Sequence, residues 1–206
     1  MNPRKTFIGV IVAVAVVIIL GYMSSGRTKI VNYPSQGSDI IAFGDSLVYG
    51  VGATAGHDFV SLLEKKIGQP IINLGHSGDT TADGLARISQ LDNFRPKVVL
   101  LLLGGNDYLK KIPAMETKRS LSLIIENIQA RGAVVLLLGV RGGLLSDNFK
   151  RMFESLRDSY GTAYVYDVLD NLLLKREYMS DAIHPNDKGY SLIADRIYPV
   201  LLKLVR

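Results

Sequence analysis

The sequence predicts an α/β fold in which a mainly parallel β-sheet is covered by helices on both faces, giving three layers. From residue 39 onward, short apolar runs alternate with segments whose apolar residues recur at helical spacing. The short runs are apolar at almost every position, as 98–103 shows, instead of alternating with polar residues. Strands of this kind are buried on both faces, and with intervening helices they build a doubly wound sheet.

Five runs are predicted as strands, because each is short, mainly apolar and bounded by polar or glycine-rich segments. These runs are residues 40–43, 70–74, 97–103, 133–138 and 163–168. Five helices are predicted where apolar residues repeat every three or four positions. These helices are residues 57–67, 80–91, 116–130, 147–160 and 189–204. We therefore expect one domain over residues 39–206, a length that can bury a single core.

The N-terminal segment predicts a transmembrane helix. Residues 7–23 are apolar and uncharged, and Arg4 and Lys5 precede them. As a helix this run would be about 25 Å long, enough to cross the hydrocarbon core of a bilayer. Tyr22 stands where an interfacial aromatic residue is expected. We therefore expect residues 1–23 to be a membrane anchor.

A cleaved signal peptide is the alternative for this segment, and it would give a secreted protein. Gly21-Tyr22-Met23 is a poor cleavage triplet, whereas Ser24-Ser25-Gly26 is tolerable. Arg4, Lys5 and the free amine precede the run, whereas Arg27 and Lys29 follow it. This balance of positive charge slightly favours an N-terminus inside the cell, which would place the domain in the periplasm. Residues 24–38 are rich in Ser, Gly and Pro, and predict a flexible stalk.

Composition excludes several classes of site. The chain of 206 residues has no cysteine, so disulfides, thiolate zinc sites and a cysteine nucleophile are excluded. Its net charge is +5, but the basic pairs Lys110-Lys111 and Lys118-Arg119 are short and are not interleaved with aromatic residues. A nucleic-acid partner is therefore not expected.

Ligands of parallel sheets bind beyond the carboxyl ends of the strands, so the loops that follow the strands are the places to search. The first such loop contains Ser46, in Gly44-Asp45-Ser46-Leu47. A serine placed there can expose its Oγ over the sheet, although a turn or helix-cap serine is the commoner explanation.

Two further loops offer hydrogen-bond donors. Gly78, in Ser77-Gly78-Asp79-Thr80, lets the backbone approach a bound oxygen, but a plain turn before a helix explains it equally well. Asn106 follows a buried strand in Gly104-Gly105-Asn106-Asp107. Its amide suits an oxyanion hole, and an Asn-Asp turn is the alternative.

The late segment Asp181-Ala182-Ile183-His184-Pro185 places an acidic residue three positions before a histidine. A carboxylate at that spacing can orient an imidazole, whose other nitrogen is then free to take a proton from a serine. A surface aspartate and a loop histidine are the alternative. His76 is a rival base because it lies near Gly78, but it has no acidic residue three positions before it.

Together these four segments resemble the four sequence blocks of the SGNH (GDSL) hydrolase family. The similarity extends over about residues 39–204, and the Gly-Gly-Asn-Asp and Ser-Gly-Asp-Thr-Thr forms look most like the bacterial arylesterase, thioesterase I and lysophospholipase branch. The resemblance implies a flavodoxin-like sheet and a serine esterase. Many members of that branch are soluble after signal cleavage, so the retained N-terminal segment expected here is a departure.

The resemblance also implies residue roles. Ser46 would attack an acyl ester, His184 would take its proton and Asp181 would orient His184. The oxyanion would be held by the N–H groups of Ser46 and Gly78 and by the Asn106 amide. No metal or organic cofactor is implied. We expect Asp45 and Asp107 to brace their loops by hydrogen bonds to backbone N–H groups.

The substrate is predicted only as an acyl ester, such as a lysophospholipid, a short-chain ester or a thioester. Leu144, Leu145 and Phe149 could line an acyl pocket, and ordinary core packing is the equal alternative. Two other functions stay open from sequence. One is an acyltransferase that uses the same three residues, and the other is a catalytically silent binding module on a membrane anchor.

Overall fold

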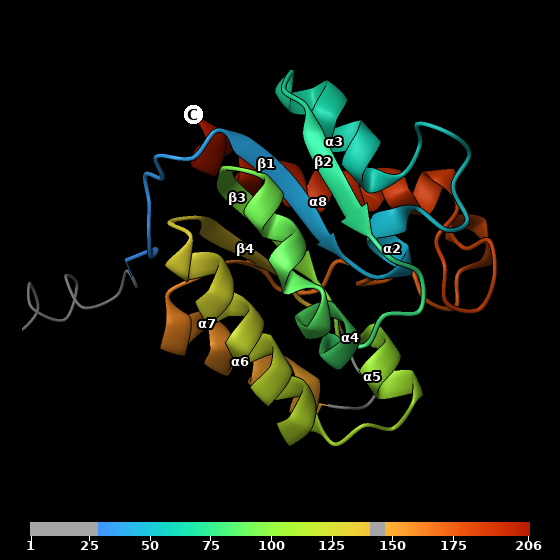
Figure 1. The fold of residues 1–206 in the computed structure, drawn as a ribbon. Helices are drawn as coiled ribbons and strands as arrows, with labels where there is room; N and C mark the ends of the chain where they lie inside the picture. The colour runs from blue at the N-terminus through green and yellow to red at the C-terminus, as the bar shows by residue number, and fades with distance from the viewer. Residues whose placement is uncertain (1–28, 141–146) are drawn as a thin grey trace, which may run out of the picture.

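The computed structural model describes residues 29–140 and 147–206. Five strands form one sheet in the order β2-β1-β3-β4-β5, and every neighbouring pair is parallel (Figure 1). The strands are β1 (Asp39–Gly44), β2 (Ile71–Gly75), β3 (Pro96–Leu102), β4 (Val134–Leu138) and β5 (Ala163–Val165). The predicted α/β fold with a mainly parallel sheet is confirmed.

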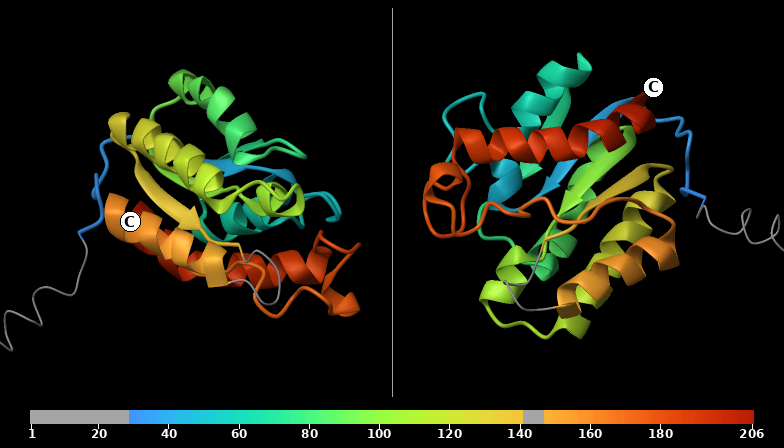
Figure 2. Two further views of the ribbon diagram at one scale, coloured as in Figure 1. Left: turned by 90° about the horizontal axis from the view of Figure 1, so that it is seen from below. Right: turned by 180° about the vertical axis from the view of Figure 1, so that it is seen from behind.

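Helices cover both faces of this sheet. They are α2 (Ser46–Tyr49), α3 (Phe59–Ile67), α4 (Thr81–Ala86), η1 (Ile88–Asn93), α5 (Gly105–Leu109), α6 (Ala114–Ala130), α7 (Asp147–Tyr160), η2 (Arg176–Tyr178) and α8 (Asp187–Val205). Helix α3 packs against α8, whereas α6 packs against both α4 and α7. Figure 2 shows the sheet between α6 on one side and α8 on the other.

The core follows from this layering. Every residue of β4 is buried, and in β3 only Lys97 is partly exposed. A strand with helices on both faces must bury both sets of its alternating side chains, which explains the continuous apolar runs of the sequence. The carboxyl ends of β1, β2 and β3 lie side by side, so the loops that follow these strands meet at one edge of the sheet.

Residues 29–38, the described part of the predicted stalk, lie along the opposite edge. The Asn32 side chain donates to the carbonyls of Gln129 and Ala133, and the Tyr33 hydroxyl donates to the Lys203 carbonyl. The predicted anchor over residues 1–23 and the first part of the stalk lie outside the described residues. Within residues 29–140 and 147–206, no helix combines the length and the apolar character needed to cross a bilayer.

Three local differences from the predicted elements affect the site. The predicted helix 80–91 is divided, because α4 ends at Ala86 and a 3₁₀-helix follows Arg87, whose φ is −110°. The short helices α2 and α5 follow directly after β1 and β3. Helices of four and five residues are too short to show an apolar period, which is why sequence spacing does not reveal them.

Candidate active site

Ser46 begins helix α2 directly beyond the carboxyl end of β1. The Asp45 carboxylate accepts the Leu47 N–H at 3.0 Å and caps this helix, which is the bracing role expected of Asp45. At Gly44 a Cβ would collide with the Leu102 carbonyl oxygen of the neighbouring strand. The glycine therefore allows the close approach after which the chain turns, and Ser46 comes to line a pocket.

His184 reaches this serine from the loop before α8. Its Nε2 lies 3.1 Å from the Ser46 Oγ, and its Nδ1 lies 2.7 Å from the Asp181 Oδ2. The other Asp181 oxygen accepts the N–H groups of Ile183 and His184 at 2.8 and 2.7 Å. The loop is therefore folded around the Asp181 carboxylate, which fixes the imidazole over Ser46.

The charge of Asp181 assigns the histidine tautomer. The hydrogen bond from the His184 ring, together with the two backbone N–H groups, lowers the pKa of Asp181 to about 2. An ionised carboxylate only accepts hydrogen bonds, so Nδ1 of His184 carries the hydrogen and donates it. Nε2 of the neutral imidazole is then an acceptor that faces the serine hydroxyl.

Asn106 lines the same pocket as Ser46 and His184. One hydrogen of its side-chain amide is donated to the Asp79 carbonyl at 2.9 Å, and an amide group has a second hydrogen to donate. Gly78, one residue before Asp79, has a φ of +88°, which favours glycine. Gly78 is not among the residues that line the pocket, and it is connected with Asn106 through Asp79.

Asp107 connects the second and third loops. Its carboxylate accepts the Thr81 N–H at 2.9 Å, the Thr81 hydroxyl at 2.5 Å and the Thr117 hydroxyl at 3.2 Å. Asp107 is buried, so these three donors compensate for its lost hydration. The residue was expected to brace its own loop, and the structure shows that it braces the neighbouring loop.

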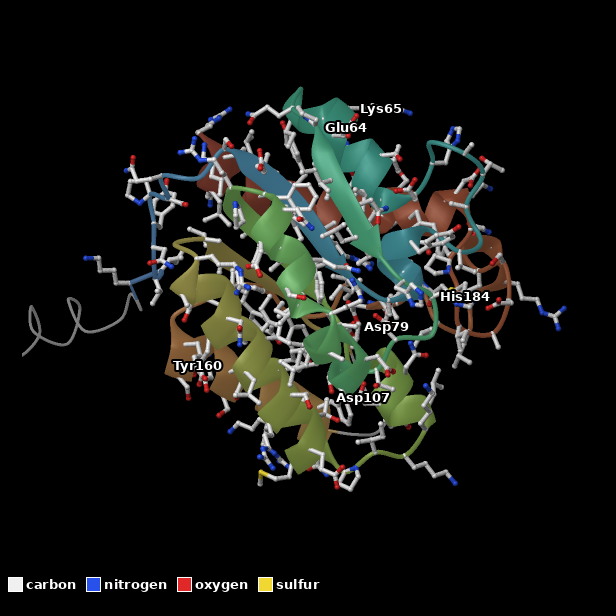
Figure 3. The ribbon with its side chains drawn as sticks, viewed as in Figure 1. Glu64, Lys65, Asp79, Asp107, Tyr160 and His184 are labelled. Carbon is white, nitrogen blue, oxygen red and sulfur yellow. The ribbon has the colours of Figure 1, made fainter. Side chains whose placement is uncertain are left out.

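Buried carboxyl groups are concentrated below the pocket, where Asp45, Asp79 and Asp107 are all less than 7% exposed. Figure 3 shows Asp79 and Asp107 at the same edge of the sheet as His184. Burial raises the pKa of the Asp45 carboxyl to about 7, against the opposing effect of the Leu47 N–H. The carboxylates of Asp79 and Asp107 add to this increase.

The pocket has a volume of about 250 Å³ and mainly apolar walls. Besides the polar groups already described, it is lined by Leu47, Gly105, Tyr108, Leu109, Val140, Leu169, Leu173, Leu174, Ala182 and Ile183. Leu174 is notable because its side chain is 78% exposed and its φ is +73°, a strained value for leucine. An apolar side chain held in this way at the pocket suits contact with an apolar ligand.

The predicted acyl-pocket residues need a correction. Leu144 and Leu145 lie outside the described residues. Phe149 is buried behind the pocket, where its ring packs edge-on against Tyr108 with centroids 5.7 Å apart. The walls come instead mainly from α5 and from 169–174, a leucine-rich segment after the last strand. Its leucines were a signal that sequence reasoning could have used.

The other two histidines have different contacts. His76 lies 2.8 Å from the Asp79 carboxylate, and its side chain is 72% exposed. His57 is held near the Thr54 hydroxyl at 3.0 Å. Among the described residues, no group of three or more His, Cys, Asp or Glu side chains is arranged to hold a metal ion.

A model of the GDSL-like lipase/acylhydrolase family matches residues 42–192, the stretch that contains all four of the loops described above. The chain belongs to this family. The resemblance seen in the sequence is therefore confirmed, and the protein is a serine ester hydrolase.

Three similar proteins support this assignment. Thioesterase 1/protease 1/lysophospholipase L1 of Escherichia coli (strain K12) is 30% identical over 175 residues, covering 81% of this chain and 84% of that protein. An arylesterase of Vibrio mimicus is 33% identical over 182 residues, covering 82% and 91%. The crystal structure of TesA superposes with a TM-score of 0.76 at 28% identity, covering 81% of this chain and 99% of that one.

Proposed function

We propose that this GDSL-family hydrolase uses Ser46 as its nucleophile and His184 as its general base, with Asp181 orienting the imidazole. The observation that carries the proposal is the hydrogen-bonded series from the Ser46 Oγ through His184 to the Asp181 carboxylate, at 3.1 and 2.7 Å. Oγ attacks the acyl carbonyl while Nε2 takes its proton, and the imidazolium then protonates the departing alcohol or thiol. A water that His184 deprotonates cleaves the resulting acyl-enzyme.

The negative oxygen that forms during both steps needs hydrogen-bond donors. We assign this role to the N–H groups of Ser46 and Gly78 and to the free hydrogen of the Asn106 amide. The shared pocket of Ser46 and Asn106, and the hydrogen bond from Asn106 to the residue after Gly78, support this assignment. Loss of one such donor typically raises the barrier by about 2.7–4 kcal/mol.

The proposed substrate is an ester or thioester with an apolar acyl group. The leucine-rich walls of the pocket support this class, because they would be covered by an acyl chain bound next to Ser46. The names of the relatives, which include thioesterase, lysophospholipase and arylesterase, support the same class. A lysophospholipid, a short-chain ester and a thioester are therefore the substrates to compare first.

We further propose that residues 1–23 anchor the protein in a membrane with the hydrolase domain outside the cytoplasm, with secretion after cleavage as the alternative. The uncharged apolar run over 7–23 supports the anchor. The described chain begins at the edge of the sheet opposite the carboxyl ends of β1 and β3 (Figure 1), whereas the pocket is lined by residues that follow those carboxyl ends. Retention of the full chain in membranes washed with alkaline carbonate tests the anchor, and release of a shortened protein would contradict it.

A fluorophosphonate probe tests the nucleophile. We expect the full-length protein in detergent to be labelled, and Ser46→Ala to lose both the label and the hydrolysis of a p-nitrophenyl ester. Ser77→Ala is the matched control, because Ser77 is an exposed serine on the neighbouring loop. A Ser46→Ala protein that hydrolyses the ester at the parent rate would disprove the assignment. Product analysis with an added alcohol distinguishes acyl transfer from hydrolysis.

A further inference from the structure

We infer that Arg87, which lies between α4 and η1, is a positioning residue that holds the oxyanion donors in place through Asp79. This inference depends on the proposed function, because it concerns the donors assigned there. The Arg87 Nε lies 2.6 Å from the Asp79 Oδ2. The side chains are only 17% and 7% exposed, so the pair is largely withdrawn from solvent.

The terminal nitrogens of the guanidinium group donate to the ends of two strands, and one of them also donates to the Gln90 side chain at 3.1 Å. One terminal nitrogen donates to the Leu74 carbonyl of β2 at 3.0 Å, and the other donates to the Gly44 carbonyl of β1 at 2.9 Å. The group also lies over the Phe43 ring, 4.1 Å from its centre. Arg87 therefore joins the strand that leads to Ser46, the strand that leads to Gly78, and the Asp79 carboxylate.

Asp79 transmits this constraint to the donors. Its backbone carbonyl accepts one hydrogen of the Asn106 amide, which orients the amide and leaves the second hydrogen for a ligand. Gly78, whose N–H is another of the three assigned donors, directly precedes Asp79. A Cβ added to Gly78 would meet no atom within 4 Å, so side-chain packing does not hold this tip of the loop. Hydrogen bonds hold it instead, at Asp79 and from the Lys110 ammonium to the Gly78 carbonyl at 3.3 Å.

Charge gives Arg87 a second effect on the same donors. Asp79 is one of three buried carboxyl groups below the pocket, and a buried carboxylate without a cation is unfavourable. Without Arg87, the Asp79 carboxylate would retain its contact with His76, whose imidazole is mostly in solvent. An uncompensated negative charge there would oppose the negative charge that develops on the substrate oxygen.

The two effects can be separated by comparing arginine with lysine. Lysine keeps the positive charge, but its single ammonium group cannot reproduce the planar set of hydrogen bonds to Asp79, Leu74 and Gly44. Arg87→Lys therefore removes mainly the geometry, and Arg87→Ala removes both geometry and charge. Arg131→Ala is the matched control, because Arg131 makes a similar pair with Asp92 at 2.6 Å and is 22% exposed, at the end of α6.

The experiment measures kcat and KM of the full-length variants with a p-nitrophenyl ester. Displacing a donor should cost less than deleting it, so we expect kcat of Arg87→Ala to fall about 10- to 100-fold. KM should change less than about threefold, because the donors act on the transition state rather than on the bound ester. The kcat of Arg87→Lys should lie between those of the parent and Arg87→Ala, and the kcat of Arg131→Ala should match that of the parent.

Two readouts separate positioning from general loss of structure. The shape of the pH profile of kcat/KM should be unchanged in Arg87→Ala, since Ser46, His184 and Asp181 are intact. Added ethylguanidinium should restore part of kcat in Arg87→Ala and none in Ser46→Ala. If Arg87→Ala does not fold, Arg87→Lys provides the test: a lower kcat with an unchanged KM supports positioning by Arg87.

The inference is overturned if Arg87→Lys and Arg87→Ala keep the parent kcat, or if both lose no more than Arg131→Ala. It is also overturned if KM alone rises. These outcomes leave the nucleophile assignment intact, because that assignment fails only if Ser46→Ala remains active.

Discussion

Two histidine–aspartate pairs lie in the loops beyond the strands, and they differ in which partner is buried. In Asp181–His184 the two groups are 2.7 Å apart, the imidazole is 15% exposed and the carboxylate is 53% exposed. In His76–Asp79 they are 2.8 Å apart, the imidazole is 72% exposed and the carboxylate is 7% exposed. Each pair is separated by three positions in the sequence.

Both pairs arise from the same spacing of three positions, but which partner is buried determines whether the pair can transfer a proton or only brace a loop. The imidazole of His184 lines the pocket with one nitrogen on Asp181 and the other facing Ser46, an arrangement that suits proton exchange between the ring and the Ser46 hydroxyl. In the other pair the carboxylate is the enclosed partner, and it is shared with Arg87. That arrangement suits a brace and leaves the His76 imidazole mostly in solvent.

The largest expected difference between the pairs is in the kcat values of the two histidine-to-alanine substitutions. His184→Ala should lower kcat about 10⁴-fold or more, because within residues 29–140 and 147–206 the imidazole of His184 is the side chain that faces the Ser46 hydroxyl. His76→Ala should lower kcat less than about tenfold, since exposed pairs contribute little and Arg87 still holds Asp79. Steady-state hydrolysis of one ester by both variants checks this. A larger loss in His76→Ala would reverse the assignment of the base.

Asp181→Asn should have the next largest effect. The asparagine keeps the size of the side chain, but it does not stabilise the imidazolium and can impose the wrong tautomer on His184. Because Asp181 is half exposed, water can replace part of its role, and we expect kcat to fall about 10²- to 10³-fold, less than in His184→Ala. With the pKa of Asp181 near 2, the parent carboxylate stays charged above about pH 3. Any loss of the parent's activity on acidification above about pH 3 should therefore not come from protonation of Asp181.

A loss in Asp181→Asn equal to that in His184→Ala would show that the carboxylate does more than orient the imidazole. Both variants should be compared at the same pH and with the same ester. The comparison with Asp79 is then direct, because Asp79→Asn should act through the donors and leave the shape of the pH profile unchanged.

A third aspartate, Asp45, extends the comparison of carboxyl groups from activity to the stability of the fold. Burial raises its pKa from 3.8 to about 7, so between these values the folded chain holds more protons than the unfolded chain. Stability should therefore fall as the pH rises from about 4 to about 7. Asp45→Asn retains an acceptor for the Leu47 N–H but no charge, and it should gain up to roughly 4 kcal/mol relative to the parent across this range.

Denaturant unfolding of the parent and Asp45→Asn at pH 4, 6 and 8 measures this gain. A difference in the free energy of unfolding that stays constant with pH would contradict the expected ionisation of Asp45.

The smallest effect on activity is expected from a substitution in the wall of the pocket that contains His184. Leu174→Ala removes an exposed apolar surface that a bound acyl chain would cover, so KM for an eight-carbon ester should rise about 3- to 10-fold. KM for the acetate ester should stay the same. Met115→Ala is the control, since Met115 is 75% exposed but does not line the pocket. Equal changes with both esters would place the acyl chain elsewhere.

Much of the fold could be predicted because burial on both faces leaves a strong pattern. The runs around Val98 and Val134 are apolar throughout, and they became the central strands β3 and β4. The elements that could not be predicted are local. Helices α2 and α5 contain too few residues for a period, and the break at Arg87 depends on hydrogen bonds to two strands that lie far from it in sequence.

The residues of the candidate site also divide into those that the sequence predicted and those that it did not. Ser46, Asn106, Asp181 and His184 were candidates from residue type, spacing and position after strands, and the resemblance to the SGNH family implied their roles. The structure brings Ser46, Asn106 and His184 to one pocket, with the Asp181 Oδ2 2.7 Å from the His184 Nδ1. Phe149 was expected in the wall but lies behind Tyr108. Arg87 was missed because an arginine within a helical run looks like an ordinary solvent-facing residue, and its partners are 8, 13 and 43 positions away.

The sequence by itself determined the α/β class, the loops that carry polar chemistry and the serine, asparagine, aspartate and histidine within them. Only the tertiary structure decided how the His184 ring is held between Ser46 and Asp181, which side chains form the pocket walls and which aspartate is held by a guanidinium group. The physical reason is that strand burial and side-chain type are local properties of the chain. Distances between loops, and the exclusion of water from one partner of a pair, exist only after the sheet has brought its strand ends together.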